Sequence, residues 1–366
     1  LIIRSPGRIN LIGEHTDYND GYVLPAAIDK AAYIAITPRT DREIHLHSID
    51  MNDSFNTSLD DLKINTTASW PNYLLGVVDQ FIKAGINVPG FDAALTGDIP
   101  LGAGLSSSAA VECAMALALN EITNAGFDKL TMVKMAQKAE HEFAGVQCGI
   151  MDQFASMFGK QHHVIRLDCR SLEYEYEPLE MEGYKIVLMD TNVKHSLAST
   201  EYNVRRKQCE TGVAMIQQYH HEIKSLRDIT MEMLDKYVLP NDLMVYQRCK
   251  YVVEENIRLL EGCKDLEAND LVAFGKKMFE THHGLSKLYE VSCPELDFLV
   301  TQVQDNPAVV GARMMGGGFG GCTINIVKEE AIDELIKESA AVYNAAMQKE
   351  LKAYIVNIED GSSVIK

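Results

Sequence analysis

The chain is poor in positive charge, in tryptophan and in long apolar runs. Lysine and arginine contribute 34 residues against 52 aspartates and glutamates, so the formal net charge is −18. A strongly acidic surface repels nucleic acids and anionic membranes, and we expect neither as a partner. No stretch approaches the roughly eighteen consecutive apolar residues that a membrane-spanning helix needs.

Paired cysteine motifs are also absent. The eight cysteines are scattered along 366 residues without a Cys-x-x-Cys pair, which indicates a reduced setting and predicts a cytoplasmic protein. A hydrophobic content of 46% and a length of 366 residues allow one large or two ordinary domains with an ample core. The chain opens on Leu1 and enters its first motif at once, so we expect a further segment before Leu1 in the natural protein.

Hydrophobic periodicity predicts a chain that mixes strands and helices. A polar, acidic connection at 173–182 separates two such series, and we place the domain junction there, with domains 1–180 and 181–366. The last strands are free to pack back on the first domain. Strands are expected at 28–37, 43–48, 91–96, 164–168, 184–190, 322–327 and 353–358, and helices at 71–82, 111–122, 131–143, 242–261, 268–287 and 294–303.

The first motif, GRINLIGEHTDYN at 7–19, ends a short apolar run with an unusual group of polar side chains. Glu14 and Asp17 supply carboxylates and His15 an imidazole. Carboxylates accept charge-assisted hydrogen bonds, so this group suits a neutral ligand rich in hydroxyls. Arg8 stands apart and could face a phosphate. The alternative is a solvated acidic turn.

A glycine-rich loop follows a predicted strand and leads into an alanine-rich helix, as GDIPLGAGLSSSAA at 97–110. Glycines allow close backbone approach, and the free amides and dipole of a helix start favour an anion. The loop lacks the Gly-Lys-Ser/Thr of a Walker motif, and Ser107 replaces the third glycine of a dinucleotide fingerprint. The alternative is a glycine turn with serine helix caps.

Two further features stand out. Asp152 lies in an apolar, helix-like stretch, where a carboxylate is costly unless it is paired or functional; a helix cap or salt bridge is the alternative. Six glycines fall within 311–321, which indicates a special backbone geometry. For Trp70, the single tryptophan, we favour simple packing over stacking on a base.

Together the three glycine-containing motifs resemble the signature motifs of the small-molecule kinase superfamily that includes galacto-, homoserine and mevalonate kinases. The segment 7–19 resembles the galactokinase signature itself, which the other two enzymes lack. AEHEF at 139–143, CGIMDQ at 148–153 and EYNVR at 201–205 are also similar to galactokinase segments, so the resemblance covers essentially the whole chain. Asp20 departs from the glycine that the family usually has there.

This resemblance implies an α/β (α+β) sugar kinase of two domains with mixed sheets and helices and an active site in the cleft between them. It implies transfer of the γ-phosphoryl group of MgATP to the anomeric hydroxyl of α-D-galactose, by a protein that we expect to be a monomer. The implied catalytic pair is Asp152 and Arg8. The implied sugar contacts are Glu14, His15, Asp17 and Tyr202. The phosphate loop is Gly102, Ala103, Gly104, Leu105, Ser106, Ser107 and Ser108, and the magnesium ligands are Ser108 (or Ser107) and Glu140.

Two rival functions stay open at this point. A kinase for N-acetylgalactosamine could carry the same signature with a roomier pocket. A catalytically silent galactose sensor could share the fold, although it would be expected to have lost phosphate-loop or acid–base residues. Here Arg8, Asp152, Glu140 and the three serines are all present, which disfavours the sensor.

Overall fold

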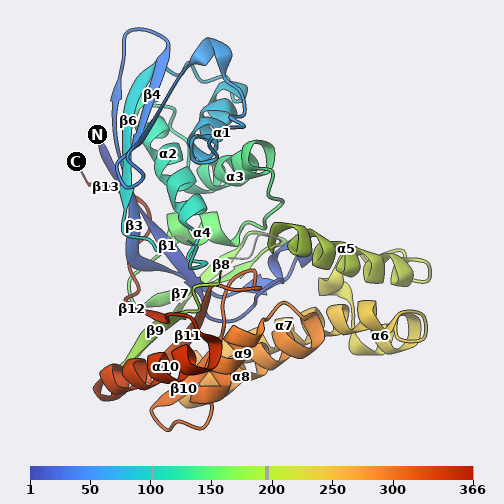
Figure 1. Cartoon of the computed structure of the whole chain (residues 1–366). Coiled ribbons are helices and arrows are strands. Elements are labelled where there is room, and N and C mark those ends of the chain that lie inside the picture. The colour runs from blue at the N-terminus through green and yellow to red at the C-terminus, as the bar shows by residue number, and fades with distance from the viewer. Residues whose placement is uncertain (101, 194–197, 366) are drawn as a thin grey trace.

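The structure is a computed structural model that describes residues 1–100, 102–193 and 198–365. Strands and helices are mixed along the described chain and gather into sheets flanked by helices, as the α/β expectation requires (Figure 1). The strands are β1 (Ile2–Asn10), β2 (Tyr22–Val23), β3 (Pro25–Pro38), β4 (Glu43–Ser48), β5 (Asp53–Ser58), β6 (Phe91–Gly97), β7 (His163–Asp168), β8 (Tyr174–Pro178), β9 (Tyr184–Asp190), β10 (Val309–Met314), β11 (Cys322–Lys328), β12 (Lys352–Val356) and β13 (Ser363–Val364).

The helices follow from capping and burial. The α-helices are α1 (Trp70–Lys83), α2 (Ser107–Thr123), α3 (Lys129–Ala139), α4 (Met151–Phe158), α5 (Ala198–Gln217), α6 (Met231–Tyr237), α7 (Leu243–Glu267), α8 (Leu271–His283), α9 (Pro294–Val303) and α10 (Ile332–Met347). Pro71 stands in the first turn of α1, where its missing N–H costs nothing. The side chain of Asp242 caps α7 by accepting from Val245 N.

A six-stranded sheet with the order β13-β1-β3-β6-β4-β5 forms one half of the molecule. Its pairs are antiparallel except β4 with β6, which run parallel. Helices α1 to α4 lie on one side of it (Figure 1), and their apolar faces share a buried core with β3, β4 and β6. The alanine-rich α2 packs directly on β1 and β3, because small side chains allow a helix to lie close to a sheet.

The C-terminal half is built on a four-stranded antiparallel sheet with the order β10-β11-β9-β12. Helices α8, α9 and α10 lie beside it in Figure 1, while α5, α6 and α7 extend to one side. A third, small sheet has the order β2-β7-β8. The last strand, β13, pairs with β1 (Ile3 opposite Val364), so the two chain ends lie together. The boundary at 180/181 stays a prediction.

Three local expectations differ from the structure. The segment 173–182, expected to be a connection, contains the strand β8. This strand pairs with β7, although its polar composition did not predict a strand. The helix expected from Thr131 to Phe143 starts earlier, because Asp128 caps it by accepting from Thr131 N. It also changes at Ala139 into the π-helix η3 (Glu140–Ala144). Among the described residues, no helix is both long and apolar enough to cross a membrane.

Candidate active site

The first motif and the phosphate loop meet at Gly7 and Arg8. Arg8 N donates to Leu105 O (3.1 Å), and a Cβ on Gly7 would lie 2.7 Å from that same oxygen. Only glycine therefore permits this approach. The register of β1 against β3 shifts between Pro6 and Arg8, which marks a local irregularity in the strand just before Arg8 pairs with Ala27.

Arg8 and Asp152 form a two-point ion pair. Arg8 Nε donates to Asp152 Oδ1 (2.8 Å) and Arg8 Nη2 to Asp152 Oδ2 (2.9 Å). Arg8 Nη1 also donates to Gly104 O (2.7 Å), so one guanidinium joins Asp152 to the loop. Ser106 Oγ donates to Asp152 Oδ2 (2.5 Å). The Arg8 side chain is 5% exposed and that of Asp152 27%, so the carboxylate keeps access to a ligand.

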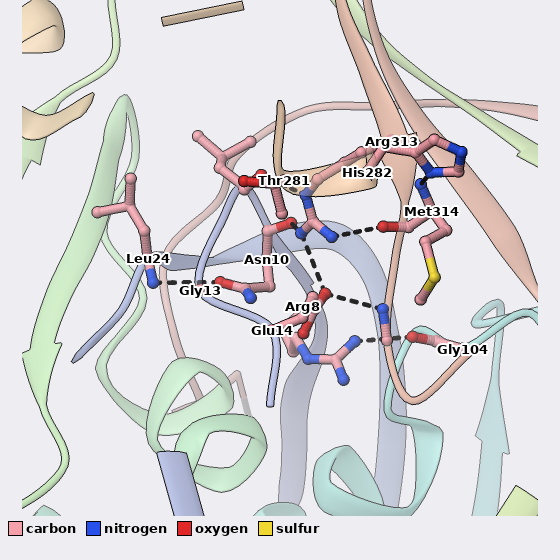
Figure 2. Close-up of polar contacts among 12 residues, drawn as sticks. Arg8, Asn10, Gly13, Glu14, Leu24, Gly104, Thr281, His282, Arg313 and Met314 are labelled. Atoms are coloured by element: carbon pink, nitrogen blue, oxygen red, sulfur yellow. Dashed lines mark hydrogen bonds and ion pairs between the residues drawn. The ribbon is translucent and has the colours of Figure 1, made fainter. Parts of the chain in front are cut away.

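Glu14 is held by the third glycine-rich motif. Its Oε1 accepts from Arg313 Nη2 (3.0 Å), as Figure 2 shows, and also from Gly316 N (2.8 Å). Arg313 is fully buried and also donates to the main-chain oxygens of Asn10, Leu11 and Met314. Burial by itself would raise the pKa of Glu14, but the charges of Arg313 and Arg8 outweigh burial and lower it.

His15 and Asp17 both respond to burial. Burial lowers the pKa of His15 to about 4, against the smaller opposing effects of Glu14 and of the Gly317 backbone. Burial also raises the pKa of Asp17 to about 7, and the nearby charge of Asp152 adds to this effect. The ring centroid of Tyr202 on α5 lies 5.4 Å from that of His15, although 187 positions separate these two expected sugar contacts in the sequence (202 − 15).

These side chains line one cavity of about 170 Å³. Arg8 and Asp152 stand on its wall together with the four expected sugar contacts and Glu140. The remaining lining residues are Val146, Cys148, Gly149, Met151, Gly316 and Gly317. Gly149 gives Asp17 its space, because a Cβ there would lie 1.7 Å from Asp17 Oδ2. A compact cavity with carboxylates, an imidazole and a phenol can hold a small molecule rich in hydroxyls.

The phosphate loop has the backbone expected of an anion site. Gly102 and Gly104 adopt φ values of +80° and +77°, and Ser106 adopts +56°, which is unusual for a residue with a side chain. The helix α2 starts at Ser107 and its first amides have no partner within the helix. The hydroxyl of Ser106 does not cap α2, because it donates its hydrogen bond to Asp152. Leu101 lies outside the described residues.

Ser108 and Glu140 face each other beside the loop. Ser108 Oγ donates to Glu140 Oε1 (3.2 Å), and Gln153 Nε2 donates to Glu140 Oε2 (2.7 Å). Burial raises the pKa of Glu140, and the charge of Asp152 raises it further. Adjacent ligands of an octahedral Mg²⁺ with bonds of about 2.0–2.1 Å stand about 2.9 Å apart, so the two oxygens suit one such ion. In the described part of the chain, no group of three or more His, Cys, Asp or Glu side chains could hold a metal.

A second cavity, of about 370 Å³, adjoins the start of α2. Ser107, Ser108 and Val111 of α2 form one wall, and Trp70 and Tyr73 of α1 form another. Trp70 Nε1 donates to Asp53 Oδ2 (2.9 Å), which fixes the indole at the rim. The indole also packs on the core, as expected from the sequence, but it lines this cavity as well.

Sequence reasoning missed two residues that support the site. Arg313 was expected only as part of a glycine-rich stretch, yet it holds Glu14. Gln153, fully buried, bridges Glu140 and Glu112 through one amide nitrogen. A polar residue inside an otherwise apolar or glycine-rich segment was the available signal in both cases, since burial of such a group requires partners.

Three family models match parts of this chain. A model of the GHMP kinases N terminal domain matches residues 72–160, and a model of the GHMP kinases C terminal region matches residues 263–345. A model described as the galactokinase galactose-binding signature matches residues 1–38, the segment that carries Arg8, Glu14, His15 and Asp17.

Individual relatives match over nearly the whole length. A galactokinase from Clostridium beijerinckii is 43% identical over 365 residues, which cover 99% of this chain and 94% of the relative. One from Thermotoga neapolitana is 43% identical over 359 residues, 98% of each chain. The crystal structure of Lactococcus lactis galactokinase complexed with galactose matches with a TM-score of 0.94 at 35% identity, covering 99% of this chain and 94% of that one. A mevalonate kinase structure at 21% identity (TM-score 0.66) shares the fold.

Proposed function

This chain belongs to the galactokinase family of GHMP kinases, and from that premise we propose that it transfers the γ-phosphoryl group of ATP to the anomeric hydroxyl of α-D-galactose. The products are galactose 1-phosphate and ADP. The observation that carries the proposal is the Arg8–Asp152 pair, which stands on the wall of the hydroxyl-binding cavity while Arg8 also contacts the phosphate loop at Gly104.

We propose that galactose occupies the smaller cavity. Glu14 and Asp17 accept hydrogen bonds from its hydroxyls, and His15 and Tyr202 complete the contacts. The positive charge of Arg313 keeps one carboxylate ready as an acceptor, since it lowers the pKa of Glu14. Charged hydrogen bonds contribute about 1.5–3 kcal/mol each, enough to hold a neutral sugar in water.

Phosphoryl transfer depends mainly on positioning and charge stabilisation. Asp152 orients the anomeric hydroxyl and stands ready to accept its proton while that oxygen bonds to the γ-phosphorus. The bond from the γ-phosphorus to the leaving oxygen of ADP breaks in the same displacement. Arg8 holds Asp152 in place from one side and places positive charge where the sugar meets the transferred group.

ATP fits the remaining features of this region. The loop Gly102–Ser108 and the first amides of α2 favour the phosphates. We propose that the adenine enters the cavity between Trp70, Tyr73 and α2, which adjoins Ser107 and Ser108. Ser108 and Glu140 would hold Mg²⁺, which supplies charge neutralisation on the phosphates. Because ATP is the phosphoryl donor, we further propose a cytoplasmic enzyme. The expected monomer stays a prediction, which light scattering would test.

One assay tests this function against its rivals. ADP release is followed by a coupled reaction with galactose, N-acetylgalactosamine, glucose or mevalonate as acceptor. We expect turnover with galactose to exceed that with each of the others. Preference for N-acetylgalactosamine would replace the proposed substrate, and galactose binding without ADP release would indicate a sensor.

A further inference from the structure

His15 occupies a backbone conformation that costs free energy, and it stands on the wall of the sugar cavity. Its φ is +62°, in the left-handed region, and its side chain lines the cavity. The residue is 4% exposed. Among the residues that the structure describes, Nε2 finds no partner at hydrogen-bonding geometry. A strained residue with an unsatisfied buried nitrogen points to a ligand contact.

The opposite ring nitrogen is tied to a chain of hydroxyl and thiol groups behind the cavity. His15 Nδ1 lies 2.7 Å from Tyr18 Oη, and Tyr18 Oη lies 2.8 Å from Tyr289 Oη. Tyr289 Oη lies 3.2 Å from Cys209 Sγ. Tyr18 belongs to the short helix η1 (Asp17–Asn19), Tyr289 to the π-helix η5 (Gly284–Tyr289) and Cys209 to α5. Neither tyrosine is among the residues that line the cavity.

General chemistry decides which way the protons point along this chain. A phenol is a stronger acid than a neutral imidazole N–H, and an unprotonated imidazole nitrogen is a stronger acceptor than a phenol oxygen. Tyr18 therefore donates to His15 Nδ1. Because each hydroxyl carries one proton, Tyr289 donates to Tyr18, and the thiol of Cys209 donates to Tyr289. A neutral imidazole whose Nδ1 accepts carries its proton on Nε2.

We propose that Tyr18, Tyr289 and Cys209 form a hydrogen-bonded chain that holds His15 in its Nε2–H form, so that His15 donates to a hydroxyl oxygen of the sugar. The carboxylates of Glu14 and Asp17 are acceptors in the same cavity. A hydroxyl can donate to a carboxylate and accept from His15 at once, whereas an analogue without that hydroxyl leaves both groups unpaired. The three residues are positioning residues, and only the identity of the ligand rests on the function proposed above.

The tautomer can be read directly by ¹⁵N nuclear magnetic resonance. In protein with ¹⁵N-labelled histidine at pH 7.5, the His15 signals, assigned by their loss in His15→Gln, are expected to show protonated Nε2 and unprotonated Nδ1. Tyr18→Phe removes the donor to Nδ1, and a mixture of both tautomers is expected. A wild-type ring protonated on Nδ1, or a tautomer that Tyr18→Phe leaves unchanged, overturns the proposal.

Galactose binding measured by calorimetry provides the second readout. Loss of one buried hydrogen bond predicts about tenfold weaker binding for Tyr18→Phe and a smaller loss, about threefold, for Tyr289→Phe. The KM for galactose should rise while the KM for ATP stays constant. Tyr343→Phe is the control, because Tyr343 is fully buried, as Tyr289 is, and donates to Thr191 O (2.8 Å) away from the cavity.

The outcomes separate this proposal from the proposed function. If the tautomer is held as described but galactose is not phosphorylated, the kinase assignment fails and the chain of hydrogen bonds stands. If galactose is phosphorylated and both tyrosine variants bind it as the Tyr343→Phe control does, the hydrogen-bonded chain has no positioning role and the proposal is wrong.

Discussion

Arg313 Nη2 donates to Glu14 Oε1 across 3.0 Å, although 299 positions separate the two residues in the sequence. The third glycine-rich motif thereby holds Glu14 through a charge (Figure 2) as well as through the backbone N–H of Gly316. Both side chains are buried, at 0% and 2% exposure, so neither charge can be satisfied by water if the other is removed.

Arg313→Met is therefore expected to destabilise the protein. The variant removes the hydrogen-bonded ion-pair partner of the buried Glu14 carboxylate, and breaking such a pair costs about 3–5 kcal/mol in the free energy of unfolding. Urea denaturation measures the loss. The double variant Arg313→Met with Glu14→Gln should recover part of it, because the uncompensated charge is gone. A loss below about 1 kcal/mol for the single variant would show that the pair is not the structural link inferred here.

Asp152→Asn should abolish most turnover while the fold persists. The amide keeps the size of the side chain but cannot accept the proton of the anomeric hydroxyl, and general-base contributions are about 10²–10⁴-fold. Steady-state kinetics measure kcat, and thermal unfolding together with galactose calorimetry provides the control. Turnover close to that of the wild-type protein would remove Asp152 from the mechanism.

Asp17→Asn should stabilise the ligand-free protein at alkaline pH and weaken galactose binding. Burial and Asp152 raise the pKa of Asp17 to about 7, so the folded state holds this proton more tightly than the unfolded state, whose aspartate titrates near 3.9. The free energy of unfolding contributed by Asp17 therefore falls as pH rises from about 4 to about 7.

At pH 8 the free energy of unfolding of the Asp17→Asn variant should exceed that of the wild-type protein by about 2–4 kcal/mol. Each pH unit by which the pKa rises corresponds to ~1.4 kcal/mol, and the sum is reduced because Asp17 is partly exposed. Urea unfolding at pH 5 and pH 8 measures this. A difference between the two proteins that does not grow with pH argues against a raised pKa.

Gly149→Ala should impair the sugar site selectively. A Cβ at this position would lie 1.7 Å from Asp17 Oδ2, so the carboxylate must move. We expect galactose affinity to fall at least about tenfold, as for loss of one charged hydrogen bond. Affinity for ADP, which we propose binds at the phosphate loop, serves as the internal control. Unchanged galactose affinity would show that Asp17 does not contact the sugar.

Glu140→Gln should raise the magnesium requirement. The amide keeps the hydrogen bond from Ser108 but loses the negative charge that Mg²⁺ prefers. A Mg²⁺ titration of activity, paired with Mn²⁺ binding to the ADP complex by electron paramagnetic resonance, should show about tenfold weaker metal affinity. Galactose binding without nucleotide should change less than metal binding, because Glu140 stands on the wall of the sugar cavity without being one of the expected sugar contacts. Equal Mn²⁺ affinity in both proteins would exclude Glu140 as a ligand.

The sequence by itself determined the strands and helices whose apolar pattern is regular, such as β4 and α9, and the three motifs with their chemical character. Local order and residue type suffice for these features, because periodicity and glycine geometry act over a few residues. The polar strand β8 escaped prediction because its stability comes from pairing with β7, a partner that its own residues do not encode.

Only the tertiary structure decided how the polar groups of the site are shared. It assigned Ser106 to Asp152, gave Glu14 a cation from Arg313 and tied His15 to Tyr289 through Tyr18. Each of these links, except the one between His15 and Tyr18, joins segments that are far apart in the chain. Their partners are set by how β1, α2, α4 and η5 and the third glycine-rich motif pack together, and local sequence patterns carry no information about such packing.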